Sequence, residues 1–296
     1  MVVFFEYNKM RSLKTKTHFC FVSSLYFRIS IHTSKHSTMK TTQRLLMTAA
    51  FVFGTLFSIN YRATAHPTAG KPVEHAAWSG LLKKYVDAKG VVNYAGFKKD
   101  SDALKKYLEL LSANAPDESS WSKDEQLAYW INAYNAFTVQ LILDNYPVAS
   151  IKDIGAKIKI PFVNTPWDVK FITIGGKKMD LNNIEHGIIR KKFAEPRIHF
   201  ALVCAAKSCP PLRNEAYTAD RLNAQLDDQG RDFLNDPTKN EVTEKSAEIS
   251  KILSWYGGDF TKTMPMVDWI NKYANKKMSK DGSISYKTYN WELNGK

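Results

Sequence analysis

A single capped helix constrains the fold of this chain more than any other feature. Ser122 and Glu125 form the S-x-x-E pattern of a capping box, which marks the first turn of a helix. Apolar side chains then recur at steps of three and four residues, and Pro147 disfavours helix in the residue before it. These apolar positions are Leu127, Trp130, Ile131, Tyr134, Phe137 and Leu141. The sequence therefore predicts a core helix over about 122–145.

The segment 39–65 has the three parts of a secretory signal peptide. A basic start precedes an uncharged run over 45–59, and a small-residue A-x-A cleavage site ends at Ala65. The run is shorter than the roughly 20 residues of a membrane span, which argues against a stable anchor after cleavage. We therefore expect a periplasmic or secreted protein. Because a secretory signal normally begins near its basic residues, we predict that translation starts at Met39 and that 1–38 is a mis-assigned upstream extension.

The net charge of +13 is mostly a property of the precursor. Residues 1–65 hold nine of the 42 Lys and Arg residues and one of the 29 acidic residues, so 66–296 carry only +5. That value is ordinary for 231 residues and does not argue for a nucleic-acid partner.

We expect residues 66–74 to be a tether and residues 75–293 to form one α+β domain, a mixed sheet with packed helices. Helices and strands follow one another without a regular βα rhythm, which favours this class. The expected further helices cover 74–87, 101–113, a span from Asp180 or Asn182 to Phe193, 218–235 (capped by Thr218) and 264–274. Around Gly90 we expect a turn and a short extended segment. The expected strands cover 167–174 and 178–181 (joined by Gly175-Gly176), 198–203, 241–249 and 283–293.

Glu185 and His186 are polar residues in a segment whose neighbouring residues are mostly apolar. On a helical wheel Glu185 falls in the middle of the stripe formed by Leu181, Ile184, Ile188 and Ile189, and His186 falls at its edge. A carboxylate there needs a partner or a raised pKa, so it is either a catalytic or orienting acid or a paired structural one. The His186 ring is either a general base or a rim histidine.

Cys204 ends the expected apolar strand and is followed by Cys209. Three interpretations stay open: a disulfide between the two, a reactive thiolate at Cys204, or buried inert thiols. Lys207 and Arg213 are close enough in sequence to lower a thiol pKa. Period two places His199 on the opposite strand face, which makes His186 the better partner for Cys204. A zinc site lacks diagnostic spacing, and we predict no metal and no cofactor.

Asn132 and Asn135 lie three apart on the capped helix and so share a face. Their amides could stabilise a reacting oxygen or orient a histidine, or they could tie the helix to loop backbone.

The motifs Y-W-I-N-A-Y-N-A (129–136), I-E-H-G-I-I-R (184–190) and P-R-I-H-F-A-L-V-C (196–204) resemble those of the domain of unknown function 547 family, in its bacterial exported form. The C-P-P-L run at 209–212 and the terminal Y-N-W-E-L-N also resemble its pattern. The resemblance implies no substrate. Its most widespread elements match Asn132, Asn135, Glu185, His186 and Cys204. The resemblance also implies that the positions of His199 and Cys209 vary in the eukaryotic versions of the family, which weighs against an obligatory disulfide and for Cys204 acting alone.

Two functional hypotheses follow. The first is a cysteine-dependent hydrolase or acyl transferase, with Cys204 as nucleophile, His186 as base, and Glu185, Asn132 or Asn135 in support. The second is a non-catalytic extracytoplasmic domain that binds a small molecule, peptide or glycan, with a structural disulfide between Cys204 and Cys209. Its binding residues would come from aromatic and polar side chains that include Trp130, Tyr134, Trp167, His199, Arg213, Trp255 and Tyr256. The sequence leaves open whether the protein is an enzyme.

Overall fold

The computed structural model of the protein describes residues 70–155 and 165–295. These residues belong to one unit, in which helices and short strands pack around two apolar clusters. The predicted upstream extension, the signal peptide and the first part of the tether lie outside the described residues.

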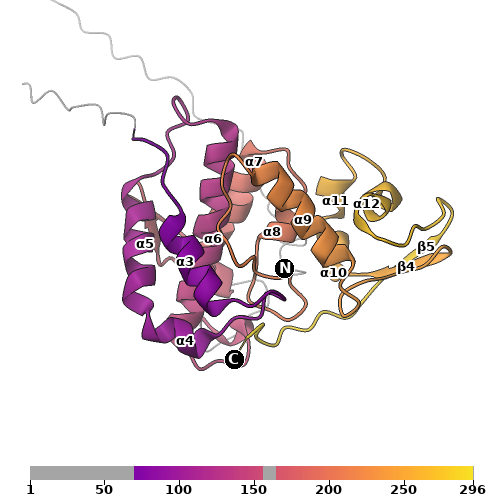
Figure 1. Ribbon diagram of the computed structural model, residues 1–296, viewed down its shortest axis with the longest axis horizontal. Coiled ribbons are helices and arrows are strands. Elements are labelled where there is room, and N and C mark those ends of the chain that lie inside the picture. Colours follow the sequence, from indigo (N-terminus) through magenta and orange to yellow (C-terminus); the bar gives the residue numbers. More distant parts are fainter. Residues whose placement is uncertain (1–69, 156–164, 296) are drawn as a thin grey trace, which may run out of the picture. The chain divides into compact units, whose positions relative to one another are not determined.

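The first group of helices contains the capped one, with the others lying beside it (Figure 1). It comprises α3 (Ala76–Tyr85), α4 (Tyr94–Lys99), α5 (Ser101–Ala113) and α6 (Lys123–Asn145). Both bonds of the capping box are present: the Ser122 hydroxyl accepts from the Glu125 N–H, and the Glu125 carboxylate accepts from the Ser122 N–H. The predicted bounds of α6 and α5 are confirmed. From 126 to 139, however, α6 is buried on every side, so its polar side chains must find partners inside the protein.

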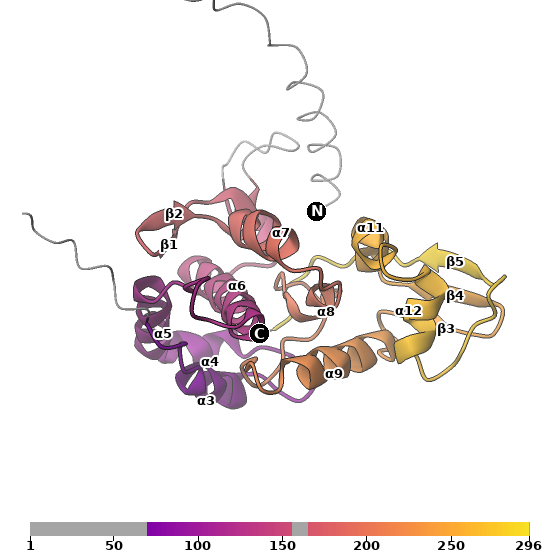
Figure 2. The same cartoon turned by 90° about the horizontal axis from the view of Figure 1, so that it is seen from above.

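A β-hairpin and a wide helical segment cover another side of α6, opposite α3 and α4 (Figure 2). Strands β1 (Ile172–Ile174) and β2 (Lys177–Met179) are antiparallel, and the predicted hairpin is confirmed. Gly175 and Gly176 have positive φ, as this two-residue turn requires. The strand starts later than predicted because Pro166–Asp168 form a 3₁₀ turn; a second such turn covers Ile151–Asp153.

The predicted strand over 198–203 is wrong. Residues Ile198–Ala201 form the short helix α8, and 202–204 continue as extended chain without a neighbouring strand in the described part of the protein. A short apolar run suits a buried helix as well as a buried strand, so periodicity could not separate them. The Asn135 amide supplies the bonds that a neighbouring strand would have made, since it donates to the Ala201 carbonyl and accepts from the Val203 N–H (2.9 Å each).

The second half of the domain contains a helix, a small mixed sheet and three further helices. They are α9 (Leu222–Leu234), β3 (Glu241–Val242), β4 (Ser246–Ile249), α10 (Lys251–Trp255), α11 (Gly257–Phe260), α12 (Met266–Tyr273) and β5 (Ser283–Tyr286). Strand β4 lies in the middle, antiparallel to β3 and parallel to β5. The hairpin over 241–249 and the helix near 264–274 are confirmed.

Three expectations in this region and near Gly90 need correction. Helix α9 begins at Leu222 and not after Thr218, because the Thr218 N–H donates to the Gln225 side chain and a turn intervenes. The strand expected over 283–293 ends at Tyr286. The extended segment after Gly90 is limited to the region of Val92, because the Asn93 side chain caps α4. Helices α10 and α11 were not predicted. The α+β class itself is confirmed.

Candidate functional site

A π-helix places Glu185, His186 and Arg190 together. After one turn capped by the Asp180 carboxylate, which accepts from the Asn183 N–H (2.6 Å), residues Asn183–Ile189 widen to π geometry. The Arg190 N–H donates to the Glu185 carbonyl, five residues back. Helix α7 (Arg190–Lys192) follows directly. Single π turns are uncommon and occur often at functional sites.

The Glu185 carboxylate is buried, with 4% of the residue exposed. The Tyr256 hydroxyl donates a hydrogen bond to it. Burial alone would raise the pKa of Glu185, but His186, His199, the Tyr256 hydrogen bond and Arg190 more than offset it and hold the pKa below its usual value. Glu185 is therefore a charged group inside the protein.

The His186 ring is oriented by charged neighbours. Its Nδ1 lies 2.9 Å from Arg190 Nη1, and its Nε2 lies 3.9 Å from Glu185 Oε1. A guanidinium can only donate, so Nδ1 accepts and the proton of the neutral ring is assigned to Nε2, facing Glu185. Burial, which outweighs the nearby carboxylate, lowers the pKa of His186. Its Nδ1 lone pair is thus engaged by Arg190.

Asp259 of α11 completes the cluster. Arg190 donates two parallel bonds to it, Nε to Oδ2 (2.6 Å) and Nη2 to Oδ1 (3.0 Å). The buried His199 ring lies with Nε2 2.9 Å from Asp259 Oδ2 and stacks on Tyr256 at 3.7 Å between centroids. Burial lowers the pKa of His199, and the bonds from His199 and Arg190 hold the pKa of Asp259 well below its usual range. We call Glu185, His186, Arg190, His199, Tyr256 and Asp259 the buried charge cluster.

Cys204 and Cys209 form a disulfide, and both residues are buried. The Tyr289 hydroxyl lies 3.2 Å from the Cys204 sulfur and 3.1 Å from the Cys209 sulfur. Burial raises the pKa of Tyr289, and the charge of Glu185 adds to this effect. Between the cysteines, Ala205 has φ of +57°, a region that residues with a Cβ rarely adopt. Tyr289 thus contacts both sulfurs of the disulfide and is within the electrostatic influence of Glu185.

Asn132 and Asn135 bind backbone with both polar atoms of each amide. Asn132 donates to the Tyr217 carbonyl (2.8 Å) and accepts from the Tyr217 N–H (3.0 Å). Asn135 donates to the Ala201 carbonyl and accepts from the Val203 N–H. The structure therefore places both as ties between α6 and loop backbone.

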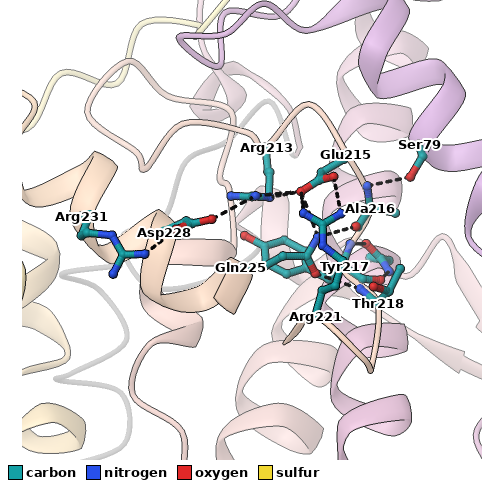
Figure 3. Close-up of polar contacts among 11 residues, drawn as sticks. Ser79, Arg213, Glu215, Ala216, Tyr217, Thr218, Arg221, Gln225, Asp228 and Arg231 are labelled. Atoms are coloured by element: carbon teal, nitrogen blue, oxygen red, sulfur yellow. Dashed lines mark hydrogen bonds and ion pairs between the residues drawn. The ribbon is translucent and has the colours of Figure 1, made fainter. Parts of the chain in front are cut away.

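The predicted binding residues do not lie on one surface. Trp130 and Tyr134 are buried in α6, and Trp167 and Tyr256 are buried as well. Arg213 belongs to a separate network (Figure 3), where it contacts Glu215 and Asp228. Arg221 and Gln225 also bind the Glu215 carboxylate, and these bonds outweigh burial and lower its pKa to about 2. This network holds the loop 213–218 against α9.

A cavity of about 240 Å³ opens beside the buried charge cluster. Phe193 and Ile198 supply apolar wall to this cavity. Its charged lining is positive on balance, with four cations (Arg190, Lys191, Lys192 and Lys262) and two carboxylates (Glu195 and Asp259). The sequence did not indicate Asp259, because this residue follows two glycines in a stretch with no periodic pattern. It also did not indicate that the Tyr256 hydroxyl is a hydrogen-bond donor in this cluster.

Within the described ranges, no group of three or more His, Cys, Asp or Glu side chains is arranged so that it could hold a metal ion. No helix in that part of the chain is long and apolar enough to cross a membrane.

Comparison with models of protein families yields a match. The model of the family described as "Protein of unknown function, DUF547" matches residues 118–234, which include α6, the π-helix, the cysteine pair and α9. No curated protein and no solved structure matches the chain.

Proposed function

We propose a function from the geometry alone, because the DUF547 family, whose model matches residues 118–234, carries no function in its name. The proposed function is that of an exported, non-catalytic binding domain. The observation that carries the proposal is the engagement of both groups needed for cysteine catalysis. The Cys204 sulfur is bonded to Cys209, and the His186 Nδ1 lone pair accepts from Arg190. A thiolate nucleophile and a free basic nitrogen are what the hydrolase hypothesis requires.

Export is part of the same proposal. Disulfides persist in oxidising compartments such as the periplasm or the extracellular space. The disulfide supports the sequence-based expectation of export through a signal peptide cleaved after Ala65. The expectations of no stable membrane anchor and no nucleic-acid partner rest on the sequence and are kept in this proposal.

We place the ligand in the cavity beside the buried charge cluster. Within the described part of the chain Lys191 makes no ion pair, and the Lys262 ammonium lies 3.6 Å from Asp259 on a largely exposed side chain. Such exposed charges are available to a ligand at low cost. With the apolar wall at Phe193 and Ile198, the cavity suits an acidic peptide segment carrying an apolar side chain.

Fluorescence anisotropy with a labelled peptide of alternating Glu and Leu tests this proposal. We expect saturable binding to the wild type, several-fold weaker binding to Lys191→Glu, and unchanged binding to Lys276→Glu, which reverses an exposed charge elsewhere. Equal affinity for a Lys–Leu peptide, or no effect of Lys191→Glu, would contradict the proposal.

One observation favours the cysteine-dependent hydrolase or acyl transferase as a second candidate. Once reduced, the Cys204 thiol would lie beside the Tyr289 hydroxyl, which is within the field of Glu185. For the wild type this candidate predicts hydrolysis of p-nitrophenyl acetate only after reduction. The activity should be lost in Cys204→Ser and present without reductant in Cys209→Ser. Alkylation by iodoacetamide, followed by intact mass with and without reductant, reports the thiol state directly. Turnover that is equal in both serine variants would eliminate this candidate.

A further inference from the structure

We propose that a second cavity, next to the disulfide, binds a compact anion that carries two or more carboxylate or phosphate groups. The cavity measures about 290 Å³, near the lower end of ligand pockets. Three lysines line it, Lys89, Lys207 and Lys239, and no acidic residue of the described chain does. It is separate from the cavity at Arg190, so this inference stands or falls independently of the proposed function.

Two of the three lysines can turn to a ligand without leaving a buried charge unpaired. Lys89 is exposed and, within the described residues, makes no ion pair. Lys207 pairs with Glu292, but both side chains are more than half exposed, and such pairs contribute little to stability. Lys239 is held by Asp236 with a side chain only 10% exposed. The cavity thus has one fixed ammonium and two movable ones.

A neutral amide donor and apolar side chains complete the lining of this second cavity. The Asn294 Oδ1 accepts from the Tyr94 hydroxyl at 2.7 Å, which leaves its Nδ2 without a hydrogen-bond partner among the described residues. Pro210, Pro211 and Leu293 also line the cavity. A multivalent organic anion offers partners to the ammonium and amide groups and a carbon skeleton to this wall.

The walls are held in place before any ligand arrives. Gly90 has φ of +76°, and a Cβ there would lie 2.4 Å from the Pro211 Cβ, so the 89–91 turn is in direct contact with the chain that follows Cys209. A Cβ on Gly295 would lie 2.0 Å from the Val92 carbonyl oxygen. The Asp87 carboxylate accepts from the N–H groups of Lys89 and Val91. Preorganised walls reduce the ordering cost of binding.

Isothermal titration calorimetry of the full chain, with citrate and inorganic pyrophosphate as separate probes and acetate as the monovalent control, tests the inference. We expect saturable binding of at least one polyanion, no saturation with acetate, and weakening as the salt rises from about 50 to 200 mM. A preference between the two probes identifies the anionic group.

Two variants with opposite expected effects make the test specific. Lys89→Gln/Lys207→Gln should weaken binding about tenfold or more, whereas Glu292→Gln releases Lys207 and should tighten binding a few-fold. The exposed pair Lys276→Gln/Lys280→Gln is the matched control and should bind like the wild type. Absence of saturable binding to both probes, or equal losses in the cavity and control variants, overturns the inference.

Discussion

The surroundings of Glu185 matter for stability, because a buried charge must keep its partners. Tyr256→Phe removes the hydroxyl that donates to the carboxylate and keeps the ring that stacks on His199. We expect the free energy of unfolding to fall by about 1–3 kcal/mol, as measured by urea denaturation at pH 7. Tyr286→Phe, at an exposed position, should change it by less than about 0.5 kcal/mol.

A double-mutant cycle checks the stated cause. Adding Tyr256→Phe to Glu185→Gln should cost less than adding it to the wild type, because no charge is then left without its donor. Equal costs in the two backgrounds would mean that the hydrogen bond to the carboxylate is not what stabilises the protein.

His75 predicts a pH dependence of stability far from the candidate site. The ring is buried beside the Tyr107 hydroxyl (2.7 Å), and burial lowers its pKa from 6.5 to about 4. Between these values the unfolded chain binds the proton more strongly, so stability is complete above pH 6.5 and is lost as the pH falls toward 4.

The matching experiment compares slopes. In His75→Gln, the slope of unfolding free energy against pH between 4 and 6.5 should decrease by up to about 1.4 kcal/mol per pH unit relative to the wild type. Urea denaturation at several pH values measures it. An unchanged slope would show that His75 titrates normally in the folded protein.

At the scale of elements, α6 organises the domain through two asparagines. Asn135 substitutes for a neighbouring strand along 201–203, and Asn132 holds the loop at Tyr217. Because all four amide atoms are used by backbone, the two side chains act as structural ties in this structure. This explains why a helix packed with apolar residues carries two amides in its buried centre.

Asn135→Leu tests this role. The substitution keeps the volume but leaves the Ala201 carbonyl and the Val203 N–H without the partner that Asn135 provides. We expect a loss of about 2–4 kcal/mol in unfolding free energy. Asn145→Ala, at the exposed end of the same helix, serves as the control and should cost far less. Similar losses at the two positions would refute the special role of Asn135.

At the scale of the whole domain, the C-terminal segment and the disulfide loop close the fold together. Leu293 forms a β-bridge with Ala206, and Gly295 forms one with Val92. The last described residues therefore contact both the loop closed by the disulfide and the short segment between α3 and α4. The Asn294 N–H also donates to the Ala205 carbonyl (3.0 Å). The cysteine pair therefore stabilises a junction between distant parts of the chain.

The double variant Cys204→Ser/Cys209→Ser tests how much the disulfide at this junction contributes to stability. The bond spans a sequence separation of five residues, for which the chain-entropy relation predicts a loss of about 2 kcal/mol in unfolding free energy. Thermal or urea unfolding measures it. Reductant should destabilise the wild type by a similar amount and leave the double-serine variant unchanged. A wild type that is insensitive to reductant, with free thiols by mass, would show that the bond does not form in solution.

The sequence by itself determined the elements whose signals are local. The capping box and Pro147 set the bounds of α6, the Gly175-Gly176 turn set the β1–β2 hairpin, and the apolar stripe correctly predicted a buried Glu185. Each of these depends on residues within one or two turns of one another, so spacing alone carries the information.

Only the tertiary structure decided which partners the residues of the site and the core contact. The run 198–203 is equally apolar in a helix and in a strand, and Asn135, more than 60 residues away, settles its conformation. Asp259 reaches Arg190 and His199 across 60 or more residues, and no local pattern marks it. Buried charges and cysteines are chemically ambiguous until their partners are known, because the same side chain is a catalyst when its reactive atom is free and a structural tie when that atom is bonded.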